Sequence, residues 1–144
     1  GASAEMLGAS RKSMELANEY AKERKQFGQF IGQFQAVKHM LAEMLEKVEN
    51  GHAAVYYAAW AIDASAPDEA LSASVAKSTL NESSRKVCGD SVQVMGGIGF
   101  TWEHDLHFYF KRAKHLEVLY GDVDHHYGQV LDEVLAGRTA GTVG

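Results

Sequence analysis

Two glycine-containing segments carry the side chains best suited to bind a phosphate-bearing ligand. Residues 23–32 contain Arg24, Gln26 and Phe27, and residues 93–101 contain the run Gly-Gly-Ile-Gly. A guanidinium offers paired, planar donors that match phosphate oxygens, and glycines let the backbone approach a ligand closely. Each segment by itself has an ordinary explanation, because a lone arginine often forms a surface ion pair and glycines often end helices. Their combination in one chain is what indicates a binding site.

The histidines do not form a recognisable metal or catalytic motif. His104 and His107 lie three residues apart, which places them on one face of a helix, and Asp105 lies between them. No His-Glu-x-x-His motif and no matched pair of ligands on a second helix accompany them. The sequence also contains no serine elbow, Cys-His pair or phosphate-binding P-loop. We therefore expect no metal site.

Composition and charge exclude several functional classes. A chain of 144 residues, 46% hydrophobic and 23% charged, is long enough for one domain with a core. The formal charge of −5 and the lack of clustered Lys and Arg argue against nucleic-acid binding. No run of about 18 apolar residues is present, so we expect no membrane span. The single cysteine, Cys88, and the absence of a signal-peptide pattern favour a cytoplasmic, reducing compartment.

Helical periodicity dominates the rest of the chain. It predicts helices over about residues 4–22, 34–62 and 67–95, then a fourth helix after Thr101 and a short last one, with a loop at 23–32. The helix at 34–62 presents an apolar stripe with one vacant position, at Gly51. The stripe consists of Phe34, Val37, Leu41, Met44, Val48, Val55, Ala59 and Ile62. The helix at 67–95 is rich in Ala and Ser, which predicts a buried central helix that its neighbours approach closely.

The expected helix ends complete the fold prediction. Thr101 is expected to cap the fourth helix, with Glu103 in its first turn, and Gly137 is expected to close the last one. The elements predict an all-α fold: an antiparallel up-down four-helix bundle over residues 1–137 with a short additional C-terminal helix. Residues 138–144 are expected to form a flexible tail. The first helix has no recognisable N-cap, so we expect the chain to be a fragment of a longer protein.

The two candidate binding segments carry a family resemblance. Residues 20–28 contain Glu-Arg-x-x-Phe-Gly, and residues 93–101 contain Gln-x-x-Gly-Gly-x-Gly-Phe. Ala76-Lys77 lies between them, and Arg112-Ala113-Lys114 follows. In this order the motifs resemble the C-terminal helical domain of the acyl-CoA dehydrogenases, and the resemblance extends over nearly the whole chain.

The resemblance implies a flavin-dependent function. Members of the family use FAD to remove hydrogens from the α and β carbons of an acyl-CoA thioester, and pass the electrons to an acceptor of the electron-transfer flavoprotein type. The domain would supply the core of a homo- or hetero-oligomer and part of a FAD site shared with a neighbouring subunit. The FAD contacts would be Arg24, Gln26, Phe27, Phe34, Gln35, Gln93, Val94, Met95, Gly96 and Gly97. The fragment alone is expected to bind no FAD and to be inactive.

The catalytic base is where the sequence departs from the family pattern. Many members place a glutamate before a Gly-Thr pair near the end of the bundle, and Tyr120 occupies that position here. Tyrosine, with an ordinary pKa near 10, is a poor base at neutral pH. Glu117 and Asp122 are weak candidates nearby, and Tyr120 with Gly121 would contact the substrate. The alternative function is a non-catalytic structural or assembly subunit of the same fold in a hetero-oligomer.

Overall fold

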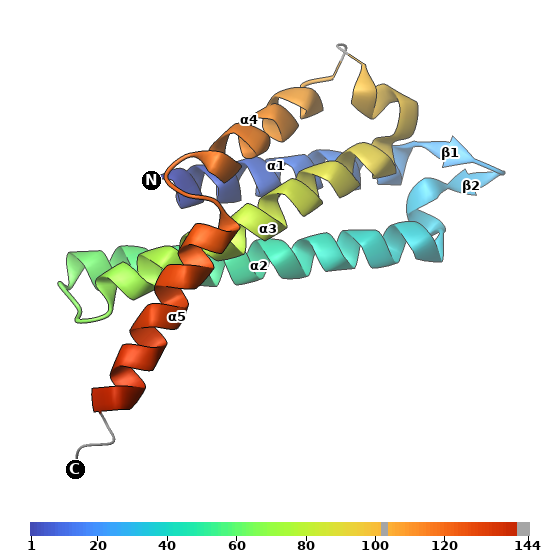
Figure 1. Ribbon diagram of the computed structural model, residues 1–144. Helices are drawn as coiled ribbons and strands as arrows, with labels where there is room; N and C mark the ends of the chain where they lie inside the picture. Colours follow the sequence, from blue (N-terminus) through green and yellow to red (C-terminus); the bar gives the residue numbers. More distant parts are fainter. Residues whose placement is uncertain (102–103, 141–144) are drawn as a thin grey trace.

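Four helices alternate in direction and pack alongside one another, as the computed structural model shows over the residues it describes, 1–101 and 104–140 (Figure 1). They are α1 (Ala2–Glu23), α2 (Gln35–Asp63), α3 (Glu69–Met95) and α4 (Leu106–Val118). A fifth helix, α5 (Val123–Ala140), packs on α3 and leaves the bundle obliquely. The predicted all-α, up-down bundle with an additional C-terminal helix is therefore confirmed.

The apolar stripe of α2 follows the prediction in its first half and shifts in its second. Met44 and Val48 are buried as expected. Gly51, the vacant position, is also buried. A Cβ there would lie only 3.2 Å from a methyl group of Leu80 on α3. Beyond this point the small side chains Ala58 and Ala61 face the core, whereas Ala59 and Ile62 are exposed, so their predicted burial is wrong. The absence of a side chain at Gly51 therefore allows Leu80 of α3 to pack closely, and Gly51 belongs to the buried face of α2.

Helix α3 is the buried centre of the bundle, as predicted. It contacts α1, α2, α4 and α5. Some of its buried serines donate within the helix, as Ser91 does to the Val87 carbonyl at 2.8 Å, and others bond to neighbouring helices, as Ser84 does to the Met6 carbonyl of α1 at 3.4 Å. Ser13 of α1 donates to the Cys88 sulfur at 3.4 Å, and burial raises the pKa of that thiol. Cys88 thus acts as a small core residue, which is the commonest role of a free cysteine.

Three expected helix ends are wrong or lie outside the described residues. The Thr101 hydroxyl donates to the Ile98 carbonyl at 2.9 Å, and α4 begins later, at Leu106, so Thr101 does not cap it. Glu103 lies outside the described residues. Helix α5 passes Gly137 and reaches Ala140, so at 18 residues it is longer than α4, not short. A glycine inside a helix costs only about 1 kcal/mol, which does not force an end.

The last part of the expected tail, residues 141–144, also lies outside the described residues. None of the helices over the described ranges is long and apolar enough to cross a membrane.

Candidate functional site

A short hairpin forms where a loop was expected. Strands β1 (Lys25–Gln26) and β2 (Gln29–Phe30) pair antiparallel, and Phe27 and Gly28 form the two-residue turn between them. Both turn residues have positive φ, 52° and 81°, as tight hairpin turns require. Glycine adopts this conformation freely, but an aromatic residue is strained there by about 1 to 2 kcal/mol. Phe27 lies at the tip, where it is 92% exposed.

The hairpin and the glycine segment together line one groove. After α3, the 3-10 helix η2 (Gly96–Phe100) folds beside the hairpin and the first turns of α2, and the cavity between them measures about 770 Å³. Of the ten predicted cofactor contacts, all but Gln35 line it. The lining residues are Tyr20, Arg24, Gln26, Phe27, Ile31, Phe34, Ala36, Val37, Met40, Gln93, Val94, Met95, Gly96, Gly97 and Ile98. Segments some 70 positions apart in sequence thus converge on one surface.

The groove combines cationic, aromatic and open-backbone surface. Arg24 is exposed, and no ion pair within residues 1–101 and 104–140 involves it. The Phe27 and Phe34 rings meet edge to face, with centroids 6.3 Å apart. Gly97 has open space where a side chain would be, whereas a Cβ on Gly99 would lie 2.9 Å from the Val92 carbonyl. Gly99 therefore packs η2 onto α3, and Gly97 leaves backbone accessible to a ligand.

The predicted substrate residues lie elsewhere, in the turn between α4 and α5. Tyr120 and Gly121 both have positive φ, 64° and 104°, and the Tyr120 side chain is 76% exposed. A Cβ on Gly121 would lie 2.5 Å from the His125 ring, so only glycine fits. Asp122 accepts the His125 backbone N–H at 2.9 Å and caps α5, as expected for an aspartate at this break.

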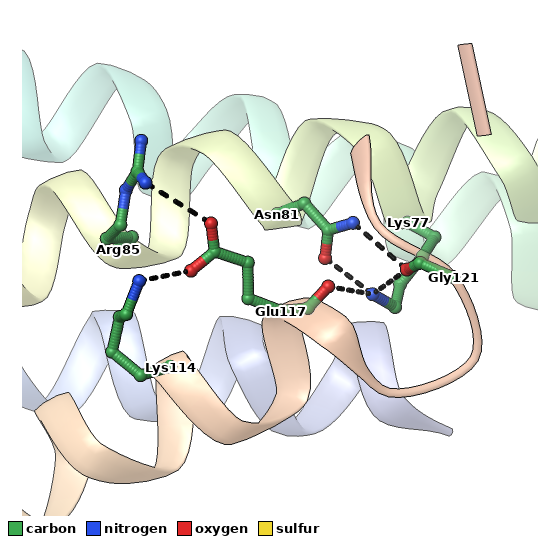
Figure 2. A network of polar contacts seen from close by, with 6 residues as sticks. All are labelled: Lys77, Asn81, Arg85, Lys114, Glu117 and Gly121. Atoms are coloured by element: carbon green, nitrogen blue, oxygen red, sulfur yellow. Dashed lines mark hydrogen bonds and ion pairs between the residues drawn. The ribbon is translucent and has the colours of Figure 1, made fainter. Parts of the chain in front are cut away.

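A buried lysine that the sequence analysis did not assign a role holds this turn. Lys77, 4% exposed on α3, donates to the carbonyls of Glu117 and Gly121 at 3.2 and 3.0 Å (Figure 2). It donates to the Leu116 carbonyl as well, at 3.1 Å. It also donates to Oδ1 of the buried Asn81. Burial lowers the pKa of Lys77, opposed by the nearby charges of Glu117 and Asp122. A cation at the end of α4 also stabilises the negative pole of that helix.

Both weak candidates for the base make structural contacts. The Glu117 carboxylate pairs with Arg85 at 3.3 Å and with Lys114 at 2.9 Å, as Figure 2 shows. Asp122 caps α5, as described above. His104 and His107 contact the backbone at the start of α4. Over residues 1–101 and 104–140, no three His, Cys, Asp or Glu side chains are grouped so as to hold a metal.

The groove and the Tyr120 turn lie well apart along α3. Lys77 lies about a third of the way along the helix and Met95 is its last residue, which separates them by about 27 Å at 1.5 Å per residue. In Figure 1 the hairpin and η2 lie at one end of the bundle, and the turn from α4 to α5 lies away from them, beside the N-terminus. The chain therefore presents two separate surfaces.

These features define a helical bundle domain with one groove that combines cationic, aromatic and open-backbone surface. Residues 1–135 match the family described as "Acyl-CoA dehydrogenase, C-terminal domain", so the chain belongs to the acyl-CoA dehydrogenase family. It is 41% identical, over 76% of its length, to the acyl-CoA dehydrogenase IpdE2 of Mycolicibacterium smegmatis, of which the match covers 33%.

Solved structures of larger proteins contain the same fold. Butyryl-CoA dehydrogenase from Megasphaera elsdenii matches with a TM-score of 0.90 at 27% identity, over 94% of this chain and 35% of that one. A chain from a structure of the electron transferring flavoprotein of Acidaminococcus fermentans matches with a TM-score of 0.90 at 31% identity, again over 94% and 35%. The chain thus spans about a third of the length of these relatives.

Proposed function

We propose that this chain is the C-terminal domain of an FAD-dependent acyl-CoA dehydrogenase, and that its groove binds the phosphate-bearing part of the FAD. The supporting observation is the convergence of Arg24 and the Gly96-Gly97 backbone in one cavity. A guanidinium that has no internal ion pair is free to bind a diphosphate with two parallel hydrogen bonds. The aromatic rings of Phe27 and Phe34 supply apolar surface beside it. The residues present therefore fit the cofactor.

Each part of the groove has a separate task in this proposal. When bound, FAD supplies the hydride acceptor for α,β-dehydrogenation of an acyl-CoA thioester. Arg24 holds the diphosphate charge, and the strained hairpin presents Phe27 toward the cofactor. Gly97 lets the cofactor approach the backbone. At the separate surface held by Lys77, Tyr120 and Gly121 form part of the wall of the acyl-CoA site.

The whole protein, of which this chain is one part, provides the test. It is purified, and its flavin absorbance is measured before and after reconstitution with FAD. We expect about one FAD per protomer, and bleaching of the flavin when acyl-CoA is added without oxygen. Absence of bound FAD after reconstitution would refute the proposal.

One observation favours a second candidate, a non-catalytic subunit of a hetero-oligomer. Tyr120 replaces the expected glutamate, and both neighbouring carboxylates make structural contacts. A site of this kind would bind FAD and acyl-CoA but leave the α-proton in place. FAD-loaded protein that binds acyl-CoA without flavin bleaching would support this candidate, and bleaching by the homogeneous protein would exclude it.

Assembly through the bundle is part of the proposal. Large apolar side chains are exposed along α2 and α5, and exposed apolar surface of this extent favours burial against another chain. They include Tyr57, Trp60 and Ile62 on α2, and Leu131, Val134 and Leu135 on α5. We propose that the oligomer passes electrons to an electron-transfer flavoprotein. Sedimentation showing a monomer at high concentration would contradict the assembly.

A further inference from the structure

The backbone of the Tyr120–Gly121 turn is held by side chains from two other helices. Lys77 and Asn81 of α3 donate to the Gly121 carbonyl at 3.0 and 3.4 Å. Nε2 of His126, on α5, contacts the Tyr120 carbonyl at 3.0 Å, and it must be the donor because a carbonyl only accepts. We call Lys77, Asn81 and His126 the carbonyl clamp.

The clamp exceeds what ending a helix requires. A single glycine beyond the last turn commonly ends a helix without any buried charge. Here the three side chains of the clamp are 4%, 1% and 9% exposed, and a buried ammonium is unfavourable unless several acceptors surround it. Lys77 has four acceptors within hydrogen-bond range. Such a contact set holds the turn in one conformation.

The conformation that the clamp holds determines where Tyr120 points. Tyr120 has a positive φ, which bulky residues adopt only when the surroundings enforce it. Its ring is 76% exposed, and the neighbouring Val118 is 70% exposed. A backbone fixed in this way is suited to present these side chains to an acyl chain, because the turn itself loses little freedom on binding.

We propose that Lys77 is a positioning residue of the acyl-CoA site: together with Asn81 and His126 it fixes the Tyr120 turn, so that the Tyr120 ring forms a preorganised wall against the acyl chain. The inference rests on the proposed function for the substrate class. The fixed turn itself does not depend on that function.

The test uses the whole FAD-loaded protein and the variant Lys77→Met, which keeps the length of the side chain and removes its charge. The matched control is Lys86→Met, on the same helix, where Lys86 is exposed and pairs with Asp90. Amide hydrogen exchange is followed in peptides that cover residues 117–124. Affinities for butyryl-, octanoyl- and palmitoyl-CoA are measured from the flavin spectrum, and retained FAD is measured in the same samples.

We expect Lys77→Met to exchange at least about tenfold faster in the turn and to bind acyl-CoA roughly tenfold more weakly, since charged hydrogen bonds are lost there. FAD retention stays unchanged, because Lys77 is about 27 Å along α3 from the groove. Lys86→Met matches the parent protein in all three measurements. Unchanged exchange in Lys77→Met, or parallel loss of FAD and acyl-CoA binding, overturns the proposal.

A second variant covers the possibility that Lys77→Met does not fold. The double variant Lys77→Met/Asn81→Leu removes both members of the buried pair, so that no buried Asn81 amide is left without the lysine that donates to it. It is expected to show the same fast exchange and weak acyl-CoA binding. If the parent protein binds none of the three acyl-CoA probes, the proposed function fails, while the exchange comparison still decides whether the clamp fixes the turn.

Discussion

Two regions about 27 Å apart along α3 use their polar groups in opposite ways. At the groove, Arg24 forms no ion pair among the described residues, and Gly97 has open space where a side chain would be. At the Tyr120 turn, Lys77, Asn81 and His126 donate to the protein's own backbone. A cation without an internal partner can bind a charged ligand directly, whereas donors bound to the backbone fix a shape. Under the proposed function, the groove would bind the charged diphosphate and the turn would present an apolar surface.

Removing the charge at the groove should have the largest effect. Arg24→Ala in the whole protein is expected to weaken FAD binding by roughly 10- to 150-fold, the equivalent of a lost charged hydrogen bond. Titration of the apoprotein with FAD measures the change. Lys22→Ala is the control, because Lys22 is an exposed cation at the same end that already pairs with Glu19 at 2.7 Å. Equal losses of FAD affinity in both variants would mean that the overall charge of this region, and not a specific contact of Arg24, determines FAD binding.

Distorting the turn should lower stability without touching the groove. Gly121→Ala adds a Cβ at φ 104°, 2.5 Å from the His125 ring, and is expected to lower the free energy of unfolding by about 1 to 3 kcal/mol. Urea unfolding measures this, and FAD content should not change. Gly8→Ala is the control, since a Cβ there meets no atom within 4 Å and alanine favours a helix. A stable Gly121→Ala protein would show that the turn is not constrained.

A smaller, pH-dependent effect is expected where α1 meets α4 near the turn. The hydrogen bond from Arg112, at 3.0 Å, lowers the pKa of Glu5 below its ordinary 4.5. The ion pair therefore stabilises the fold above that pH, and the contribution is lost as the pH falls through the lowered value. Glu5→Gln should lower the melting temperature slightly at pH 7, and the gap should close well below pH 4.5. A gap that persists in acid contradicts the ion pair as its cause.

The smallest effect is expected from removing the Tyr120 hydroxyl. Tyr120→Phe keeps the ring that would form the apolar wall, so acyl-CoA affinity should change less than about twofold and stability by less than about 0.5 kcal/mol. The flavin spectrum during acyl-CoA titration measures the affinity. If flavin reduction occurs in the parent protein and disappears in this variant, the hydroxyl takes part in the chemistry and the wall interpretation is wrong.

The long helices were predictable, since their periodicity is strong and tertiary packing agrees with it. The details that failed depend on partners far along the chain. Whether Gly51 interrupts the stripe is decided by Leu80, and whether Gly137 ends α5 is not decided by glycine alone. The hairpin at Phe27-Gly28 was missed because each strand has only two residues, too few for an alternating pattern.

Part of the candidate site was likewise predictable from the sequence and part was not. The groove residues were identified through motifs, and the structure brings nine of the ten together. The clamp was not identified, because a lysine within a run of Ala and Ser looks like an ordinary exposed position. Its burial depends on three carbonyls supplied by residues 116–121, about 40 positions away. Only the tertiary structure connects them.

Proteolysis at the tip of the hairpin should report whether a ligand occupies the groove. Phe27 is 92% exposed on a two-residue turn, and exposed loop tips are where proteases cut most readily. A protease with a hydrophobic specificity pocket would cut after this aromatic residue. A ligand that packs against Phe27 would cover the same bond. The rate of cleavage at one peptide bond would then report occupancy of the groove without a flavin signal.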